Sequence, residues 1–139
     1  MTRNLSIDFL GKWPIPGEEA RRKPARMMVV SRDKMLRLIH GEKAPMYVVL
    51  YVSNDLLHVG EFVIPAGGPS VRASDIEDHK GDEVFYVIEG PVSVFLTETK
   101  ETFEVQEGDA FLIPEGTKHQ YVNFTDKTVK AVFAVAPGI

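Results

Sequence analysis

From residue 46 onward, apolar residues recur along most of the chain with a period of two and not of 3.6. This period is typical of β-strands that bury one face. Turn-forming residues such as Glu89-Gly90-Pro91 and Pro114-Glu115-Gly116 separate the alternating stretches. The many short strands that result indicate an all-β sandwich or barrel. The predicted strands are Met46–Ser53, Leu57–Ile64, Glu83–Ile88, Val92–Thr97, Thr102–Val105, Ala110–Ile113, His119–Phe124 and Val129–Val135.

The first 45 residues follow a different pattern. They contain a basic cluster, Arg21-Arg22-Lys23 with Arg26, which is more typical of a solvated face than of a binding patch. Met27–Ser31 can form one further strand, and Arg32–His40 is the only segment whose residues are compatible with a short helix. Because 139 residues fit one domain, we interpret residues 1–45 as an N-terminal arm of the same domain and residues 46–139 as the barrel.

Composition excludes several classes of protein and of site. The chain has no cysteine, so any metal must be held by histidine, carboxylate, backbone carbonyl or water. A net charge of −4 is too small to indicate a nucleic-acid surface. No window approaches 18 uncharged apolar residues, and Asp8 lies where a signal peptide needs an apolar run. We therefore expect a cytoplasmic protein that binds neither nucleic acid nor membrane.

Four ligand-type side chains are spaced so that they can meet inside such a barrel. Glu77 and His79 are two residues apart, so on an extended chain both side chains leave the same face. Glu83 opens the next strand after the turn Lys80-Gly81-Asp82, which can bring it back beside them. His119 opens a later strand and can approach from across the barrel. Two imidazoles and two carboxylates that converge in this way make a plausible divalent-metal site.

At these residues the chain resembles the cupin superfamily. The second motif of that family, G-x5-P-x-G-x2-H-x3-N, is matched at every fixed position, and the second half of the first motif, G-x5-H-x-H-x3,4-E-x6-G, is matched as well. The matching residues are Gly108, Pro114, Gly116, His119 and Asn123, and before them His79, Glu83 and Gly90. The resemblance covers about half of the chain, and it implies a cupin-type jelly-roll barrel with a metal ion held by Glu77, His79, Glu83 and His119.

The chain departs from the family pattern at the first ligand. Glu77 stands where the family has its first histidine, and Val71 stands where the leading glycine is expected. Glutamate can also ligate a divalent ion, and two carboxylates would neutralise it. A neutral, oxygen-rich site favours Mn²⁺ or Fe²⁺, with Zn²⁺ or Ni²⁺ as possible occupants. Two alternatives stay open: Glu77 points to solvent, or the site is degenerate and binds no metal.

Further residues are weaker candidates for the pocket. Tyr121 and Asn123 share the inward face of the strand that begins at His119, so Tyr121 either donates a hydrogen bond to substrate or simply packs. Phe85 and Val87 share the face of Glu83, and we expect them to form an apolar wall.

Arg72 lies in a long loop at the expected mouth of the pocket, where it can bind a substrate carboxylate. Glu61 and His58 lie on one strand, and whichever faces inward is a candidate general base. His40 gives no signal.

Two classes of function fit these observations. The first is a metal-dependent enzyme acting on a small oxygen-rich metabolite, as an isomerase, lyase, hydrolase or dioxygenase, and the fold alone cannot choose among them. The second is a non-catalytic cupin module that binds a metal or a small molecule. The ligand set favours the enzyme, since a binding module need not keep it. We also expect a homodimer, in which the N-terminal arm adds a strand to a sheet edge of the partner.

Overall fold

The structure, a computed structural model, describes residues 27, 29–40, 46–54, 56–66 and 76–138, together with the backbone of 72–73. Within these ranges the chain consists of antiparallel β-strands and one short 3₁₀ helix, η2 (Arg32–Lys34). No helix in this part of the chain is long and apolar enough to cross a membrane. The strands are β1 (Leu36–His40), β2 (Met46–Ser53), β3 (His58–Ile64), β4 (Arg72–Ala73), β5 (Asp82–Glu89), β6 (Val92–Leu96), β7 (Glu101–Val105), β8 (Ala110–Ile113), β9 (His119–Asn123) and β10 (Val129–Ala136).

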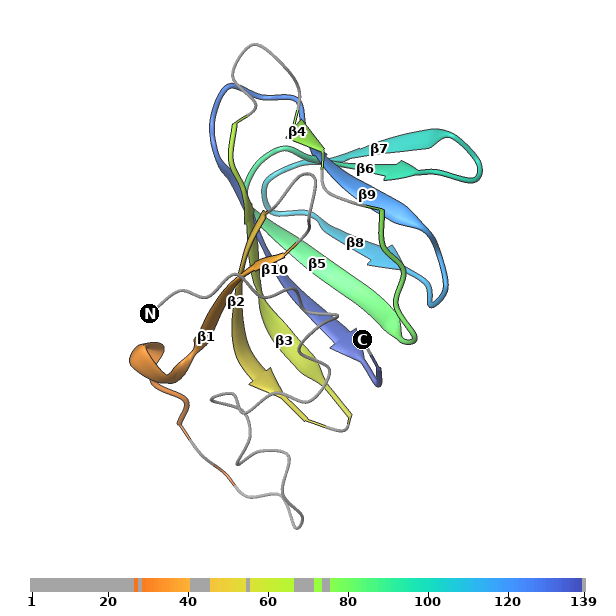
Figure 1. Ribbon diagram of the computed structural model, residues 1–139. Helices are drawn as coiled ribbons and strands as arrows, with labels where there is room; N and C mark the ends of the chain where they lie inside the picture. Colours follow the sequence, from red (N-terminus) through yellow and green to blue (C-terminus); the bar gives the residue numbers. More distant parts are fainter. Residues whose placement is uncertain are drawn as a thin grey trace.

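The strands form two sheets (Figure 1). One has six strands in the order β1-β2-β3-β10-β5-β8, and the other has four in the order β4-β9-β6-β7. Tyr121 of the smaller sheet stacks on Phe62 of the larger one, with ring centroids 4.4 Å apart, and meets the ring of Phe85 edge-on at 5.7 Å. The two sheets therefore enclose a common core, and the prediction of an all-β barrel is confirmed.

The apolar residues that alternate in the sequence are the residues whose side chains form this core. In β3 and β10, every second side chain is buried and the side chains between them are partly exposed. Phe62, Phe85 and Tyr121 are at most 1% exposed. Burying one such large side chain contributes about 1.5–3 kcal/mol to folding. We therefore expect this core to hold the barrel together without a disulfide or a metal.

The eight strands predicted from residue 46 onward are all present, with ends that differ by no more than one residue. The helix predicted over Arg32–His40 is wrong, because only the first three residues turn and the rest form β1. Pairing of β1 with β2 places His40 opposite Met46 and buries Leu38, and this packing outweighs the helix propensity of a segment too short to be stable as a helix by itself. The strand predicted over Met27–Ser31 is not formed by the residues described there.

Three glycines position the strands that carry the candidate site. A Cβ atom on Gly81 would lie 2.3 Å from the carbonyl oxygen of Ala136, so only glycine lets this turn pack against the end of β10. Gly108 and Gly116 have φ angles of +84° and +72°, in the left-handed region that glycine adopts at least cost. They form the turns before β8 and β9, and the second turn sets where His119 enters the barrel.

Candidate metal centre

The four side chains predicted as ligands lie together. One nitrogen or oxygen atom from each of Glu77, His79, Glu83 and His119 can be chosen so that all four atoms are within 4.8 Å of one another. Nε2 of His79 is 2.9 Å from Oε1 of Glu83. Oε1 of Glu77 is 3.5 Å from Nε2 of His119 and 3.6 Å from Nε2 of His79. The alternative in which Glu77 points to solvent does not match this arrangement.

Backbone hydrogen bonds bring the two motif segments together. Glu77 and His119 form an isolated antiparallel bridge, in which each N–H donates to the carbonyl of the other at 2.9 Å. The carbonyl of His79 accepts a hydrogen bond of 2.8 Å from the N–H of Gly116. The segment that carries Glu77 and His79 is therefore attached to the start of β9, and this attachment explains why residues forty positions apart share one site.

A carbonyl group orients the imidazole of His119. Its Nδ1 lies 2.8 Å from the carbonyl oxygen of Thr117, which can only accept a hydrogen bond, so Nδ1 carries a proton and donates it. Nε2 then faces Glu77 and Glu83. A histidine whose second ring nitrogen is fixed by a backbone carbonyl is the usual arrangement for a metal ligand.

Each carboxylate has one oxygen that faces the other ligand-type atoms and one that is held by a hydrogen bond. Oε2 of Glu83 accepts a short hydrogen bond from the hydroxyl of Tyr121. Oε2 of Glu77 is held by Nε2 of His40, a residue to which the sequence analysis assigned no role. The inward oxygens, Oε1 in both residues, are thereby aimed at the two imidazoles.

Three of the four inward atoms have no hydrogen-bond partner among the described residues. Nε2 of His79, Oε1 of Glu83 and Nε2 of His119 are buried, and none forms a hydrogen bond of acceptable geometry, although the first two are only 2.9 Å apart. Burying an unsatisfied polar atom costs about 1–3 kcal/mol, so most such atoms in proteins have a partner. A cation among them would satisfy all three. Two nitrogen and two carboxylate donors fit a divalent ion such as Mn²⁺, Fe²⁺, Zn²⁺ or Ni²⁺.

The carboxylates hold protons on the imidazoles. Burial alone lowers the pKa of His79, but its contacts with Glu77 and Glu83 raise the pKa to about 10. The pKa of His119 is also raised, since its contact with Glu77 outweighs burial. Burial raises the pKa of Glu77, yet the contacts with His119, His40 and His79 hold that pKa well below its usual range. Protons therefore take the place that a cation would take, and binding of a metal would release them.

An apolar pocket leads to the cluster. It encloses about 320 Å³ including its open side. Three of the four cluster residues, Glu77, His79 and Glu83, line it, and most of the remaining wall is aliphatic or aromatic. The residues that line this remaining wall are His40, Met46, Val48, Phe62, Tyr121, Phe133 and Val135. The wall predicted from Phe85 and Val87 is therefore wrong in its members, because these two side chains are buried in the core and do not line the pocket.

Tyr121 and Asn123 are both buried, as their shared face predicted, but they have different partners. Tyr121 lines the pocket and donates to Glu83. Burial and the charges of Glu83 and Glu77 keep its pKa well above the usual range, so its hydroxyl stays protonated. Asn123 donates through Nδ2 to the carbonyl oxygens of Ile64, Pro65 and Lys127. It therefore holds loops together and does not reach the pocket.

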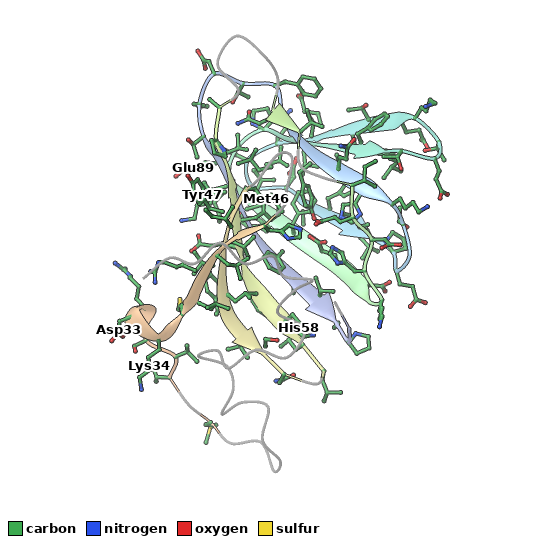
Figure 2. All side chains as sticks on the ribbon, in the orientation of Figure 1. Asp33, Lys34, Met46, Tyr47, His58 and Glu89 are labelled. Atoms are coloured by element: carbon green, nitrogen blue, oxygen red, sulfur yellow. The ribbon has the colours of Figure 1, made fainter. Side chains whose placement is uncertain are left out.

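The two candidate general bases lie elsewhere. Glu61 occupies a position in β3 between the buried Gly60 and Phe62, so its side chain leaves the outer face, where Oε2 lies 2.9 Å from Nζ of Lys130. Glu61 therefore faces outward and is not the inward-facing candidate. His58, labelled in Figure 2, is buried, and its Nδ1 lies 2.6 Å from the hydroxyl of Ser53. His58 is not among the residues that line the pocket.

Arg72 was predicted to bind a substrate carboxylate. Its backbone belongs to β4 and pairs with Asn123, but its side chain lies outside the described residues. The prediction for this side chain therefore stays a prediction.

Comparison with known proteins places the chain in a family. Residues 60–135 match the family model of the cupin domain. The chain belongs to the cupin family. This cupin is 35% identical over 78 residues to the 3-hydroxyanthranilate 3,4-dioxygenases of Bos taurus and Scheffersomyces stipitis. Each match covers 54% of this chain, but only 27% and 45% of the two dioxygenases, so the chain spans less than half the length of these relatives.

Solved structures agree on the fold. A cupin domain from Bordetella pertussis is 24% identical, with a TM-score of 0.56 over 69% of this chain and 98% of that one. The polyketide cyclase RemF from Streptomyces resistomycificus is 22% identical, with a TM-score of 0.64 over 81% of this chain and 80% of the cyclase. The fold is thus a cupin-type jelly roll, as the sequence motifs predicted.

Proposed function

We propose that this cupin is a metal-dependent enzyme that holds one divalent ion through Glu77, His79, Glu83 and His119 and acts on a small molecule bound in the adjoining pocket. One observation carries the proposal: four ligand-type atoms lie within 4.8 Å of one another, and the buried ones among them lack hydrogen bonds. A site built only for stability would have these atoms paired with one another or with the backbone.

Mn²⁺ or Fe²⁺ is the preferred ion, and Zn²⁺ or Ni²⁺ is a possible one. Two carboxylates balance the +2 charge, and hard oxygen donors make up half of the set. When bound, such an ion acts as a Lewis acid or activates dioxygen. A six-coordinate ion held by four protein atoms has two positions left for other ligands, enough for a substrate with two neighbouring donor atoms or for a substrate and O₂.

The residues that line the pocket limit the chemical class of substrate that fits it. Phe62, Phe133 and Val135 present apolar surface in the same pocket as Glu77, His79 and Glu83. No lysine or arginine lines the pocket among the described residues. The substrate is therefore oxygen-rich at the end that meets the cluster and apolar along its body, and the metal, not a basic side chain, binds its donor atoms.

The reaction that we put first is oxidative cleavage by dioxygen. Its support is the likeness to the two dioxygenases, which share 35% of 78 residues with this chain. The second candidate is a metal-assisted isomerase or lyase. The observation in its favour is Tyr121, which lines the pocket and whose hydroxyl stays protonated, so that it can turn its one proton from Glu83 to an oxyanion of the substrate.

Metal analysis of the purified, dialysed protein tests the proposal, followed by O₂-uptake measurements with small hydroxy and amino acids of aromatic and aliphatic type. We expect about one Mn or Fe per chain and O₂ uptake with a chelating aromatic substrate. Glu83→Gln should lose the metal, whereas the matched change Glu61→Gln on the outer face should keep it. Full metal content with no turnover of any substrate class would favour a non-catalytic binding module.

We also propose that the protein is a homodimer. β1 pairs with β2 of its own chain, so the part of the arm that remains available to a partner is the part before it. The outer face of the larger sheet carries large exposed apolar side chains on adjacent strands, namely Val84, Tyr86, Ile88 and Leu112. A patch of this kind favours association of copies. Light scattering at micromolar concentration should give twice the chain mass of 15.5 kDa, and the mass of one chain would contradict the proposal.

A further inference from the structure

His40 lies next to the candidate metal site, although it comes from outside the segment that matches the cupin family, residues 60–135. It is the last residue of β1, where it pairs with Met46 of β2, and it is only 7% exposed. Its Nε2 holds Oε2 of Glu77. The strand that precedes the matched segment therefore contributes a polar contact to the centre of the barrel.

This contact fixes the direction of the other oxygen of Glu77. A carboxylate is planar and rigid, so holding Oε2 determines where Oε1 lies. Oε1 faces the cluster, 3.5 Å from Nε2 of His119 and 3.6 Å from Nε2 of His79. A rotation that turned Oε1 away would also break the buried contact with His40.

We propose that His40 is a positioning residue that keeps Glu77 in the ligand set, so that it decides whether the ion has four protein ligands or three. This inference rests on the proposed metal site and extends it. The partner groups of metal ligands generally orient them and tune their basicity, and losing such a partner typically costs 10–100-fold in metal affinity.

The two carboxylates of the site differ in where their support comes from. Glu83 is held by Tyr121, which lies on β9 inside the family-matched segment. Glu77 is held by His40 from β1, outside that segment. Glu77 is also the residue that departs from the histidine of the family motif. A carboxylate brings a second, negatively charged oxygen that needs a donor, and His40 supplies one. The two residues thus form a matched pair.

The test compares the wild type with His40→Leu, His40→Phe and His40→Gln. The first two remove the donor, and the phenylalanine variant keeps an aromatic ring in case the leucine variant fails to fold. Glutamine carries an amide N–H near the position of the imidazole Nε2. Metal affinity is measured by competition with a chelator, and the visible spectrum of the Co²⁺-loaded protein reports the coordination. We expect a 10–100-fold loss of affinity and an altered spectrum for the leucine and phenylalanine variants, and recovery in His40→Gln.

A double-mutant cycle separates positioning from packing. Glu77→Ala is combined with His40→Phe, and metal affinity is measured for each single variant and for the pair. If His40 acts through Glu77, removing it from the Glu77→Ala protein changes affinity by less than twofold. An equal loss in both backgrounds would mean that His40 acts through packing alone, and the inference would be overturned.

His119→Ala distinguishes failure of this inference from failure of the proposed function. Stoichiometric metal in dialysed His119→Ala would show that the metal site itself is wrongly assigned. If His119→Ala loses its metal while His40→Phe keeps wild-type affinity and an unchanged Co²⁺ spectrum, the metal site stands and only the role of His40 is refuted.

Discussion

Strand β9 begins at His119 and ends at Asn123, and the buried polar atoms of these two residues differ in their hydrogen bonding. Both residues are fully buried, and both are fixed positions of the same sequence motif. Nε2 of His119 has no hydrogen-bond partner. Nδ2 of Asn123 donates to three backbone carbonyls, and its Oδ1 accepts from the N–H and the hydroxyl of Thr125.

This contrast shows how a ligand can be told from an anchor when both are buried. An amide whose donors and acceptor are all engaged stabilises the loops that it joins and has no capacity for a further ligand. The two carboxylates raise the pKa of the His119 imidazole and so hold a proton on it, and a metal ion can displace that proton. One motif therefore contains a group for holding an ion and a group for holding the barrel together.

Replacing His119 with alanine should have the largest effect, and on metal binding alone. The variant removes the only ligand on β9, so we expect no tight metal after dialysis. The barrel rests on apolar burial, so its far-ultraviolet circular dichroism should stay that of the wild type. Retention of about one metal per chain would contradict the assignment of His119.

Replacing Asn123 with alanine should do the reverse. It leaves the carbonyls of Ile64, Pro65 and Lys127 and the donors of Thr125 without their partner. We expect the free energy of unfolding, measured with urea, to fall by about 2–4 kcal/mol. The folded fraction should bind metal with wild-type stoichiometry. A loss of metal without a loss of stability would contradict the claim that Asn123 stabilises the fold whereas His119 binds metal.

The metal-free protein should also lose stability as the pH rises above neutrality. The pKa of His79 is about 10 in the folded protein against 6.5 in the unfolded chain. Its contribution is therefore fully present below pH 6.5 and is lost as the pH rises toward 10. Glu77, with a lowered pKa, adds stability above its ordinary value of 4.5 that is lost as the pH falls.

Urea titrations of the metal-free protein between pH 6.5 and 10 measure the slope of the free energy of unfolding against pH. Competition titrations over the same range should show that metal affinity rises as the imidazoles lose their protons. Asn123→Ala should keep the slope of the wild type, since Asn123 does not titrate. His79→Gln should flatten it. An equally steep slope in His79→Gln would mean that other groups cause it.

The smallest expected effect is a change in metal preference. Glu77→His restores the histidine of the family motif and keeps the number of ligands, so the variant should still bind metal. Imidazole is a softer donor than carboxylate, so the preference should move from Mn²⁺ toward Zn²⁺, Ni²⁺ or Cu²⁺ by about tenfold. Competition titrations on both proteins measure it. Identical preferences would mean that Glu77 orients the site but does not ligate.

The sequence predicted the strands from local spacing, and it predicted the four clustered side chains from spacing together with the resemblance to the cupin motifs. Strands with one buried face repeat every two residues, and the parity of Glu77 and His79 follows from the same geometry. The turn at Gly81 and the motif around His119 then bring the remaining two side chains into reach. Alternation and turn residues are thus enough where each element is bounded by a clear signal.

His40 was missed for a physical reason. The segment Arg32–His40 is rich in residues that favour a helix, and its strand exists only because β2 offers an edge to pair with. The alternation of Leu36, Leu38 and His40 is the one signal that pointed to a strand with His40 on its inner face. Glu61 could not be placed from the sequence either. Which face of β3 packs against the core is decided only when the two sheets come together.

The turn at Gly81 links the ligand loop to the last strand of the barrel. The backbone of Ala136 and Gly138 fills the space that a side chain on Gly81 would need, and Gly138 in turn lies close to Lys80. We therefore expect a displacement of the end of β10 to disturb the loop between His79 and Glu83. Shortening the chain after residue 135 should raise hydrogen-exchange rates in this loop, and even an alanine at position 81 should force the loop away from β10 and widen the gap between the two ligands.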